Sequence, residues 1–110
     1  YKDRVIKAKD IDTVVTGRLT GHPVRVLRNR LTRQYEELER SGAALEQLEA
    51  LGAGALRKAA EEGDMDNGSV MAGQIAGLVK QEQTCQEIIV ELFAQAKERL
   101  GMFDTAGIVK

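Results

Sequence analysis

Few side chains in this chain are of a type that does chemistry, and the first to consider is its single histidine, His22. His22 lies in a predicted turn beside Pro23, without a cysteine or carboxylate at the spacing that a metal site requires. A catalytic base would also need a partner that orients it, and the sequence places none nearby. The pattern therefore favours an ordinary loop histidine over a metal ligand or a catalytic base.

Two further candidates are the acidic pair Asp64 and Asp66 and the single cysteine, Cys85. The acidic pair lacks the other oxygen ligands and the terminal Glu of a calcium loop. Cys85 falls in the first turn of a predicted helix, where the dipole can lower a thiol pKa, but most such cysteines are structural. The chain also has no glycine motif of a recognised phosphate-binding spacing. We predict no catalytic residue and no metal ligand in this chain.

The most unusual stretch is Asn67–Lys80, where an Asn-Gly turn leads into small and aliphatic residues. Glycine or alanine occupies positions 72, 73, 76 and 77, so a helix over 70–80 would carry a flat face. Ser69 is placed to cap that helix, which leaves first-turn amides free for a ligand. Close helix packing also explains the small residues, and the pattern alone favours packing over a ligand site.

The composition of the chain limits the kind of fold that can hold these residues in place. A chain of 110 residues forms one small domain, and with two Tyr, two Phe and no Trp its core must be aliphatic and largely helical. Hydrophobic residues at 43% and charged residues at 30% are typical of a soluble protein. No run is long enough to cross a membrane, no signal peptide opens the chain, and one cysteine fits a reducing cytoplasm. Because the chain starts at Tyr1 without an initiating Met, we expect a piece of a longer protein.

Charge is distributed unevenly along the chain. Residues 1–33 hold nine Lys or Arg against three Asp, whereas residues 34–110 hold seven against fourteen acidic residues. No stacking aromatic lies between Lys2 and Arg33, so we predict no nucleic-acid partner. An acidic protein or a phosphate-bearing cofactor is the functional alternative, and a simply solvated face is slightly favoured over both.

The first part of the chain predicts a β-hairpin. Residues 1–9 form a helical or irregular lead-in, and residues 10–28 hold two short β-rich segments around a glycine-containing turn, Thr13–Thr16 and Val24–Arg28. A two-stranded ribbon is marginal by itself, so it must pack against other elements.

The rest of the chain predicts helices. Residues 29–62 hold helical patterns that start at an Asn29 cap and are interrupted by Ser41-Gly42 and by Gly52 with Gly54. Residues 63–69 read as a loop after Gly63, and residues 84–100 as an amphipathic helix that ends at Gly101. Thr84 and Glu87 form its capping box. Residues 101–110 read as a tail in which Ile108 and Val109 are the docking candidates.

Three ordered motifs resemble a known family. They are DTVVTGR with GHPVRVLRN (residues 12–29), LGAGALRKA (51–59) and NGSVMAGQIAGL (67–78). Together they are similar to the C-terminal third of the flavin-dependent enoyl-acyl-carrier-protein reductases, which belong with the nitronate monooxygenases, formerly 2-nitropropane dioxygenases. The resemblance runs from about Tyr1 to Leu100, and the longer motifs favour the reductase branch.

The resemblance implies an enzyme of fatty-acid synthesis that uses FMN and NAD(P)H to reduce a 2-enoyl thioester. The whole protein would be a TIM barrel, and this chain a mainly α cap domain with one short β-hairpin, without the barrel. The flavin phosphate site and the catalytic histidine of the family lie upstream of Tyr1, so this chain alone is expected to be inactive and to hold no cofactor. The residues implied to approach the flavin and substrate are Ser69, Met71, Ala72, Gly73 and Gln74.

Partners follow from the same resemblance. An acidic acyl carrier protein would be steered by a basic rim of Arg25, Arg28, Arg30 and Arg33. Two alternatives stay open: the cap segment of a nitronate monooxygenase, or a non-catalytic helical module that self-associates through the surface left by the missing barrel.

Overall fold

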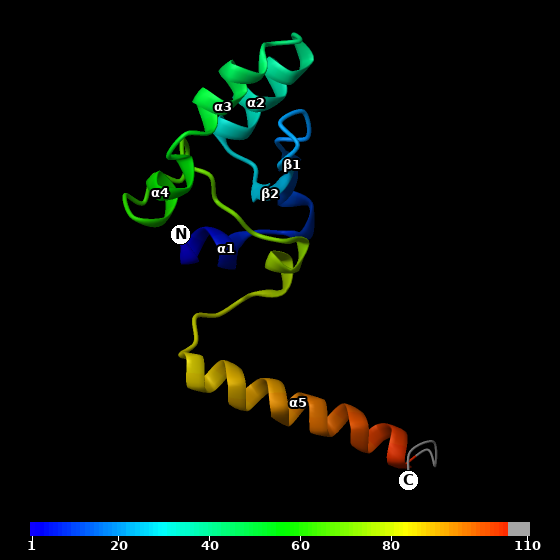
Figure 1. Ribbon diagram of the computed structural model, residues 1–110. Helices are drawn as coiled ribbons and strands as arrows, with labels where there is room; N and C mark the ends of the chain where they lie inside the picture. The colour runs from blue at the N-terminus through cyan, green and yellow to red at the C-terminus, as the bar shows by residue number, and fades with distance from the viewer. Residues whose placement is uncertain (106–110) are drawn as a thin grey trace. The chain divides into compact units, whose positions relative to one another are not determined.

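The computed structural model describes residues 1–105, and the side chains of residues 1–102 (Figure 1). The chain divides into two compact units, Tyr1–Lys80 and a second that begins at Gln81. The predicted tail beyond residue 105, including the docking of Ile108 and Val109, lies outside the described residues. In the described part, no helix has the length and apolar character to cross a membrane.

The first unit starts with helix α1 (Lys2–Lys7) and a 3₁₀ turn, η1 (Asp10–Asp12), which leads into the predicted hairpin. Strands β1 (Thr13–Thr16) and β2 (Val24–Leu27) pair antiparallel, with Thr13 opposite Leu27 and Thr16 opposite Val24. Gly17 follows β1 with φ at +76°, and a Cβ there would lie 2.7 Å from the carbonyl oxygen of His22. The chain therefore reverses at a position that only glycine fits.

Three helices follow in the order that the glycines predict: α2 (Arg30–Arg40), α3 (Leu45–Gly52) and α4 (Ala55–Ala60). Asn29 caps α2, because its Oδ1 accepts a hydrogen bond from the Thr32 amide at 3.1 Å. Gly42 and Gly54 adopt left-handed φ angles at +70°, one after α2 and the other directly before α4. The predicted helix boundaries are confirmed in this region.

The core of the first unit is small-sided. Val70, Ala59, Ala76, Leu27 and Ala8 form one buried cluster. Val70 is completely buried, and it lies inside the stretch that was predicted to be a flat-faced helix. Short side chains in this cluster let the backbones of separate segments approach closely.

The predicted helix over 70–80 does not form. Residues 70–72 are instead extended along the free edge of β2, where the Leu27 amide donates to the Val70 carbonyl at 2.8 Å and the Ala72 amide to the Arg25 carbonyl at 3.3 Å. Met71 bridges Val26, and a 3₁₀ segment, η2 (Gln74–Leu78), follows. An edge strand offers unpaired amides and carbonyls, and pairing with them outweighs the weak helix propensity of a glycine-rich stretch.

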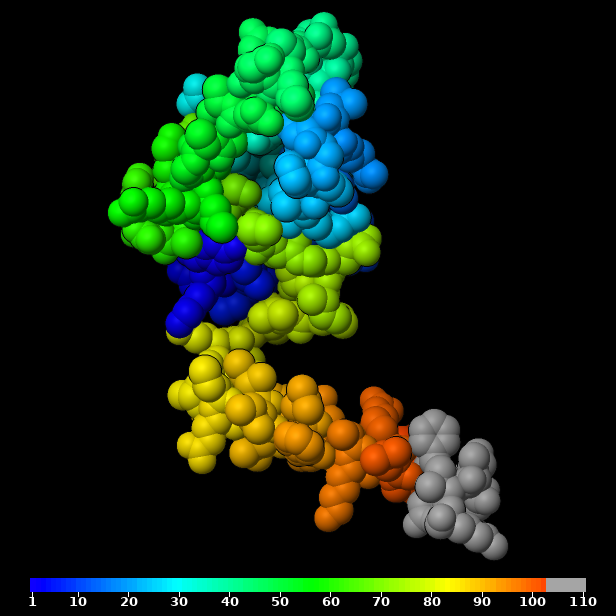
Figure 2. All heavy atoms as spheres, viewed as in Figure 1, coloured from blue at the N-terminus to red at the C-terminus, as the bar shows by residue number. Residues whose placement is uncertain are grey.

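Ser69 is therefore not a helix cap. Its amide donates to the Ala55 carbonyl at 2.8 Å, which ties the segment to α4 instead. Figure 2 shows the yellow-green atoms of this stretch lying against the blue and cyan atoms of the hairpin.

The second unit contains helix α5 (Cys85–Thr105). Its capping box is confirmed, since the Thr84 amide donates to Glu87 Oε2 at 2.7 Å and the Glu87 amide to Thr84 Oγ1 at 3.2 Å. Hydrogen bonding from Thr84, first from its backbone amide and then from its side chain, holds the pKa of the Glu87 carboxyl below its ordinary value. The predicted end at Gly101 is wrong, because the helix continues to Thr105. A glycine inside a helix costs only about 1 kcal/mol, which the flanking turns absorb.

Candidate functional site

The candidate residues form one short strip along the chain, from the extended segment to the start of η2. Met71, Gly73 and Gln74 are exposed, and Ser69 and Ala72 are half-buried. The Met71 carbonyl accepts a hydrogen bond from the Tyr1 hydroxyl at 2.6 Å, and burial raises the pKa of that phenol. We call Ser69, Met71, Ala72, Gly73 and Gln74 the candidate strip. Its backbone is fixed on one side, while three of its five residues face outward.

The loop that precedes the strip is held by a side chain that the sequence identified only as a cap. Asn29 is 5% exposed, and its Nδ2 donates to the Met65 carbonyl at 2.8 Å and to the Gly68 carbonyl at 2.7 Å. The Leu31 amide adds a bond to the Asp66 carbonyl at 3.1 Å. The start of α2 therefore fixes the loop in place. A cap residue with an amide rather than a hydroxyl was the only signal in the sequence.

The acidic pair that precedes the strip builds a turn. Asp64 Oδ1 accepts hydrogen bonds from the amides of Asp66 at 3.1 Å and Asn67 at 2.9 Å. The bonds from Asn67 are the main reason why the pKa of Asp64 lies below its ordinary value. The carboxylate is thus occupied by local backbone and side-chain donors.

Two glycines near the strip have opposite surroundings. A Cβ on Gly68 would lie 2.6 Å from the Ala59 amide nitrogen and 2.8 Å from its Cα, so the loop lies directly on the backbone of α4. A Cβ on Gly73 would have no neighbour closer than Ile75 Cγ2 at 3.9 Å among the described residues. Packing within this unit requires glycine at 68 but leaves position 73 open.

A cavity of about 210 Å³ opens beside the strip, between the hairpin and the helices that follow it. Its wall is mostly apolar and includes Val24, Leu56 and Met71. Its polar members are Thr16, Thr32, Tyr35 and Ser69. Burial and the neighbouring Glu39 carboxylate raise the pKa of the Tyr35 phenol. Such a wall suits an apolar ligand with one or two polar groups.

The four arginines of the predicted rim differ in their surroundings. Arg25 donates from Nη1 to Thr13 Oγ1 at 3.1 Å on the hairpin. Arg28 Nη1 lies 3.8 Å from Oε1 of Glu36, a residue of α2. Arg30 and Arg33 are exposed in the first turn of α2. The structure also brings Arg4 to Arg28, whose carbonyl accepts a hydrogen bond from Arg4 Nη2 at 3.5 Å. No sequence pattern predicts that Arg4 and Arg28 are neighbours. His22 and Cys85 are exposed.

Comparison with known proteins gives consistent matches. The family model described as "Nitronate monooxygenase" matches residues 1–95. The structure of FabK from Thermotoga maritima has 39% identity and a TM-score of 0.88, over 96% of this chain and 33% of that chain. The structure of its M276A mutant gives 34% identity and a TM-score of 0.78, over 96% and 31%. The chain thus spans about a third of the length of the FabK chain, and the fold class predicted from the motifs is confirmed.

Proposed function

The chain belongs to the nitronate monooxygenase family, and from that premise we propose that it is the cap part of an FMN-dependent enoyl-acyl-carrier-protein reductase. In this proposal the whole protein reduces a 2-enoyl thioester with NAD(P)H, and FMN supplies the hydride transfer. The candidate strip covers the flavin and the mouth of the substrate site. The observation that carries the proposal is the 39% identity to FabK over 96% of the chain.

The residues of the strip fit a planar group that approaches closely. Gly73 has open space where a side chain would be, and Met71 and Gln74 are exposed on a backbone fixed by Asn29 and β2. A rigid, small-sided wall of this kind excludes water and orients a ligand without a change of shape. The chain contributes no phosphate-binding loop of recognised spacing, so we propose that the grip on FMN lies in the rest of the protein.

Nitronate oxidation is the second candidate function, because the matching family is described by that activity. The same wall would serve either reaction, since hydride and electron chemistry both take place at the flavin. The apolar cavity beside the strip favours the reductase, because an acyl chain fills such a space and a small nitronate does not.

The test is a steady-state assay of the full-length protein. We expect NAD(P)H oxidation to depend on crotonyl thioester and the purified protein to carry flavin absorbance. Turnover of a nitronate with molecular oxygen, without any reduction of the thioester, would overturn the reductase proposal in favour of the second candidate. A colourless full-length protein that neither binds added FMN nor oxidises NAD(P)H would overturn both, and would favour the self-associating module.

A further inference from the structure

The first unit contains a second cavity, and its lining is basic. It has a volume of about 310 Å³ and lies among α1, η1 and the end of β2. Its lining residues are Arg4, Lys7, Ala8, Asp12, Leu27 and Arg28. Three cationic side chains thus share a cavity with one carboxylate, which gives the lining a formal charge of +2.

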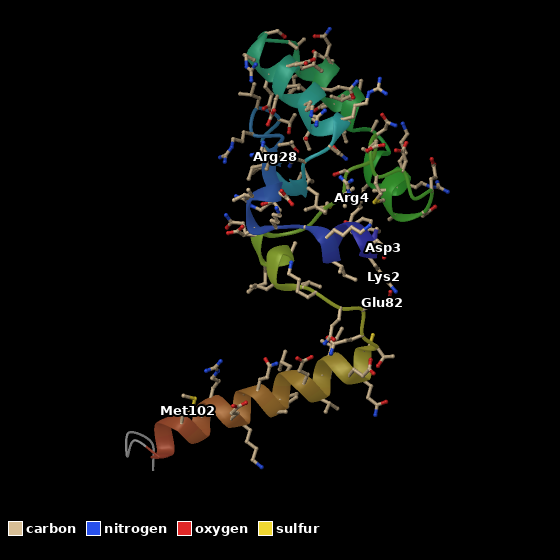
Figure 3. All side chains as sticks on the ribbon, turned by 180° about the vertical axis from the view of Figure 1, so that it is seen from behind. Lys2, Asp3, Arg4, Arg28, Glu82 and Met102 are labelled. Atoms are coloured by element: carbon tan, nitrogen blue, oxygen red, sulfur yellow. The ribbon has the colours of Figure 1, made fainter. Side chains whose placement is uncertain are left out.

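The two guanidinium groups of this cavity have only loose partners among the described residues. Arg4 comes from α1, and Arg28 is the residue that follows β2 (Figure 3). The bond from Arg4 Nη2 to the Arg28 carbonyl is long at 3.5 Å. Arg28 Nη1 lies 3.8 Å from Glu36 Oε1, and 57% of the Arg28 side chain is exposed. An exposed ion pair at that distance contributes little. The Asp12 carboxylate is already used, because its Oδ2 accepts a hydrogen bond from the Lys9 amide at 2.8 Å. Both guanidinium groups therefore keep donors for an anion.

Two hydrogen bonds link elements next to this cavity to the chain segment that holds the candidate strip. Leu27, a lining residue, donates from its amide to the Val70 carbonyl at 2.8 Å. Tyr1, at the start of α1, donates from its hydroxyl to the Met71 carbonyl at 2.6 Å. The cavity and the strip are therefore built on directly hydrogen-bonded segments, so a nucleotide, which carries a reactive end and a separate phosphate, is the ligand class that both could share.

We propose that this cavity binds the phosphate monoester of a nucleotide, either the 2′-phosphate of NADPH or the 3′-phosphate of coenzyme A. A phosphate monoester carries a charge of about −1.5 to −2 at neutral pH, which matches the formal charge of the lining. It also offers three acceptor oxygens, enough for two guanidinium groups and an ammonium. The choice of these two nucleotides rests on the proposed function, whereas the binding of a phosphate monoester does not.

The test is isothermal titration calorimetry on the full-length protein with two matched pairs of probes: NADPH against NADH, and coenzyme A against dephospho-coenzyme A. Each pair differs by one phosphate monoester. We expect at least one pair to differ about tenfold or more in Kd, the size of a lost charge-assisted contact. The pair that differs identifies the source of the phosphate.

Variants then assign the difference to the cavity. The ratio to compare is the Kd of the probe without the phosphate divided by the Kd of the probe with it. Lys7→Gln and Arg4→Gln should each reduce this ratio to about a third or less of its wild-type value, and Lys7→Arg should preserve it. Lys58→Gln and Arg18→Gln remove the same charges from exposed sites outside the cavity and should leave the ratio unchanged. Because Lys7 is exposed and Arg4 only half-buried, their variants are expected to fold, which a thermal melt checks.

The proposal is overturned if neither pair differs in the wild-type protein, or if the difference persists in both cavity variants. Equilibrium binding needs no turnover, so these outcomes are independent of the reductase assay. If the protein is an active reductase but binds both probes of each pair equally, only the phosphate-site proposal fails. If the protein is inactive but binds the phosphate-bearing probe more tightly in the predicted way, the phosphate-site proposal stands and the reductase proposal fails.

Discussion

Gly68 and Gly73 lie five positions apart in the chain, and their surroundings predict opposite effects of substitution. Gly68→Ala forces a Cβ onto the backbone of Ala59, and we expect it to lower the free energy of unfolding by about 2 kcal/mol or more. Gly73→Leu meets open space within this unit, so stability should change by only about 0.5 kcal/mol. In the full-length protein the same Leu should lower flavin content or turnover at least about tenfold, if position 73 faces the flavin.

Urea unfolding and flavin absorbance of the two variants measure these effects. Gly73→Leu with unchanged flavin content and unchanged turnover would place the glycine outside the site. A neutral Gly68→Ala would contradict the close contact with α4.

Asp64 makes the stability of the loop depend on pH. Hydrogen bonds from Asn67 hold the pKa of Asp64 below its ordinary value of 3.8, so the folded state favours the carboxylate. This contribution is present above the unfolded pKa and is lost as pH falls through the folded pKa. We therefore expect the thermal midpoint of the wild-type protein to fall more steeply below pH 3.8 than that of Asp64→Ala.

Melting curves from pH 7 down to acid conditions test the contribution of Asp64. Asp66→Ala is the matched control, since it removes an exposed carboxylate but leaves Asp64 and its hydrogen bonds in place. Parallel curves for the wild type and Asp64→Ala would contradict the role of Asp64 in the turn.

Only one of the two roles of Asn29 could be predicted from the residues next to it. Its position before a helical pattern predicted the cap, and the bond from the Thr32 amide confirms it. Its two bonds to the loop, at Met65 and Gly68, join residues more than 35 positions apart. No local pattern encodes such a pairing, because the partners are backbone carbonyls that every residue carries.

At the scale of elements, most predictions that rest on adjacent residues are confirmed, with the helix end at Gly101 as an exception, and the prediction for 70–80 failed because a neighbouring strand competes. The hairpin, the caps of α2 and α5 and the breaks between α2, α3 and α4 were predicted from adjacent residues. The stretch over 70–80 was predicted as a helix, and residues 70–72 pair with β2 instead. The small residues were read correctly as permitting close approach, but the surface that they approach includes the hairpin and η1, where a Cβ on Gly77 would lie 2.6 Å from the Asp10 amide.

Helix α5 continues through Gly101, and this predicts a stabilising substitution. Gly101→Ala should raise the free energy of unfolding by about 0.5–1 kcal/mol, because alanine is the better helix former and a Cβ there meets no described atom within 4 Å. Gly63→Ala is the matched control and should be destabilising by about 1 kcal/mol, because Gly63 has a left-handed φ of +72°. Denaturation of the full-length variants measures both, and a destabilising Gly101→Ala would restore Gly101 as a helix end.

At the scale of the whole molecule, we propose that the rim of Arg25, Arg28, Arg30 and Arg33 steers an acidic acyl carrier protein, and this proposal predicts the effect of charge reversal. Arg30 and Arg33 lie exposed in the first turn of α2, where a Glu is compatible with the helix dipole and the fold should persist. The double variant Arg30→Glu with Arg33→Glu should raise the KM for a carrier-linked enoyl substrate about tenfold and leave the KM for the coenzyme A thioester nearly unchanged. The difference should shrink at high salt.

Steady-state kinetics with both substrates measure this effect, with Lys58→Glu as a control on α4. Equal changes in KM for the two substrates would show that Arg30 and Arg33 do not recognise the carrier protein. If Lys58→Glu raises the KM for the carrier-linked substrate by the same factor, the overall charge of the protein, and not the position of Arg30 and Arg33, controls the encounter.

The sequence by itself determined the family, the mainly helical class with one hairpin, and the helix boundaries at the Asn29 and Thr84 caps and at the glycines between α2, α3 and α4. These features depend on residue types that are adjacent in the chain or on motifs that read in order. Only the tertiary structure decided that Val70–Ala72 is extended, that Asn29 fixes the loop before the strip, and that Arg4, Lys7 and Arg28 share a cavity. Each of these depends on which distant backbone satisfies a given amide or carbonyl, and chain order does not specify that choice.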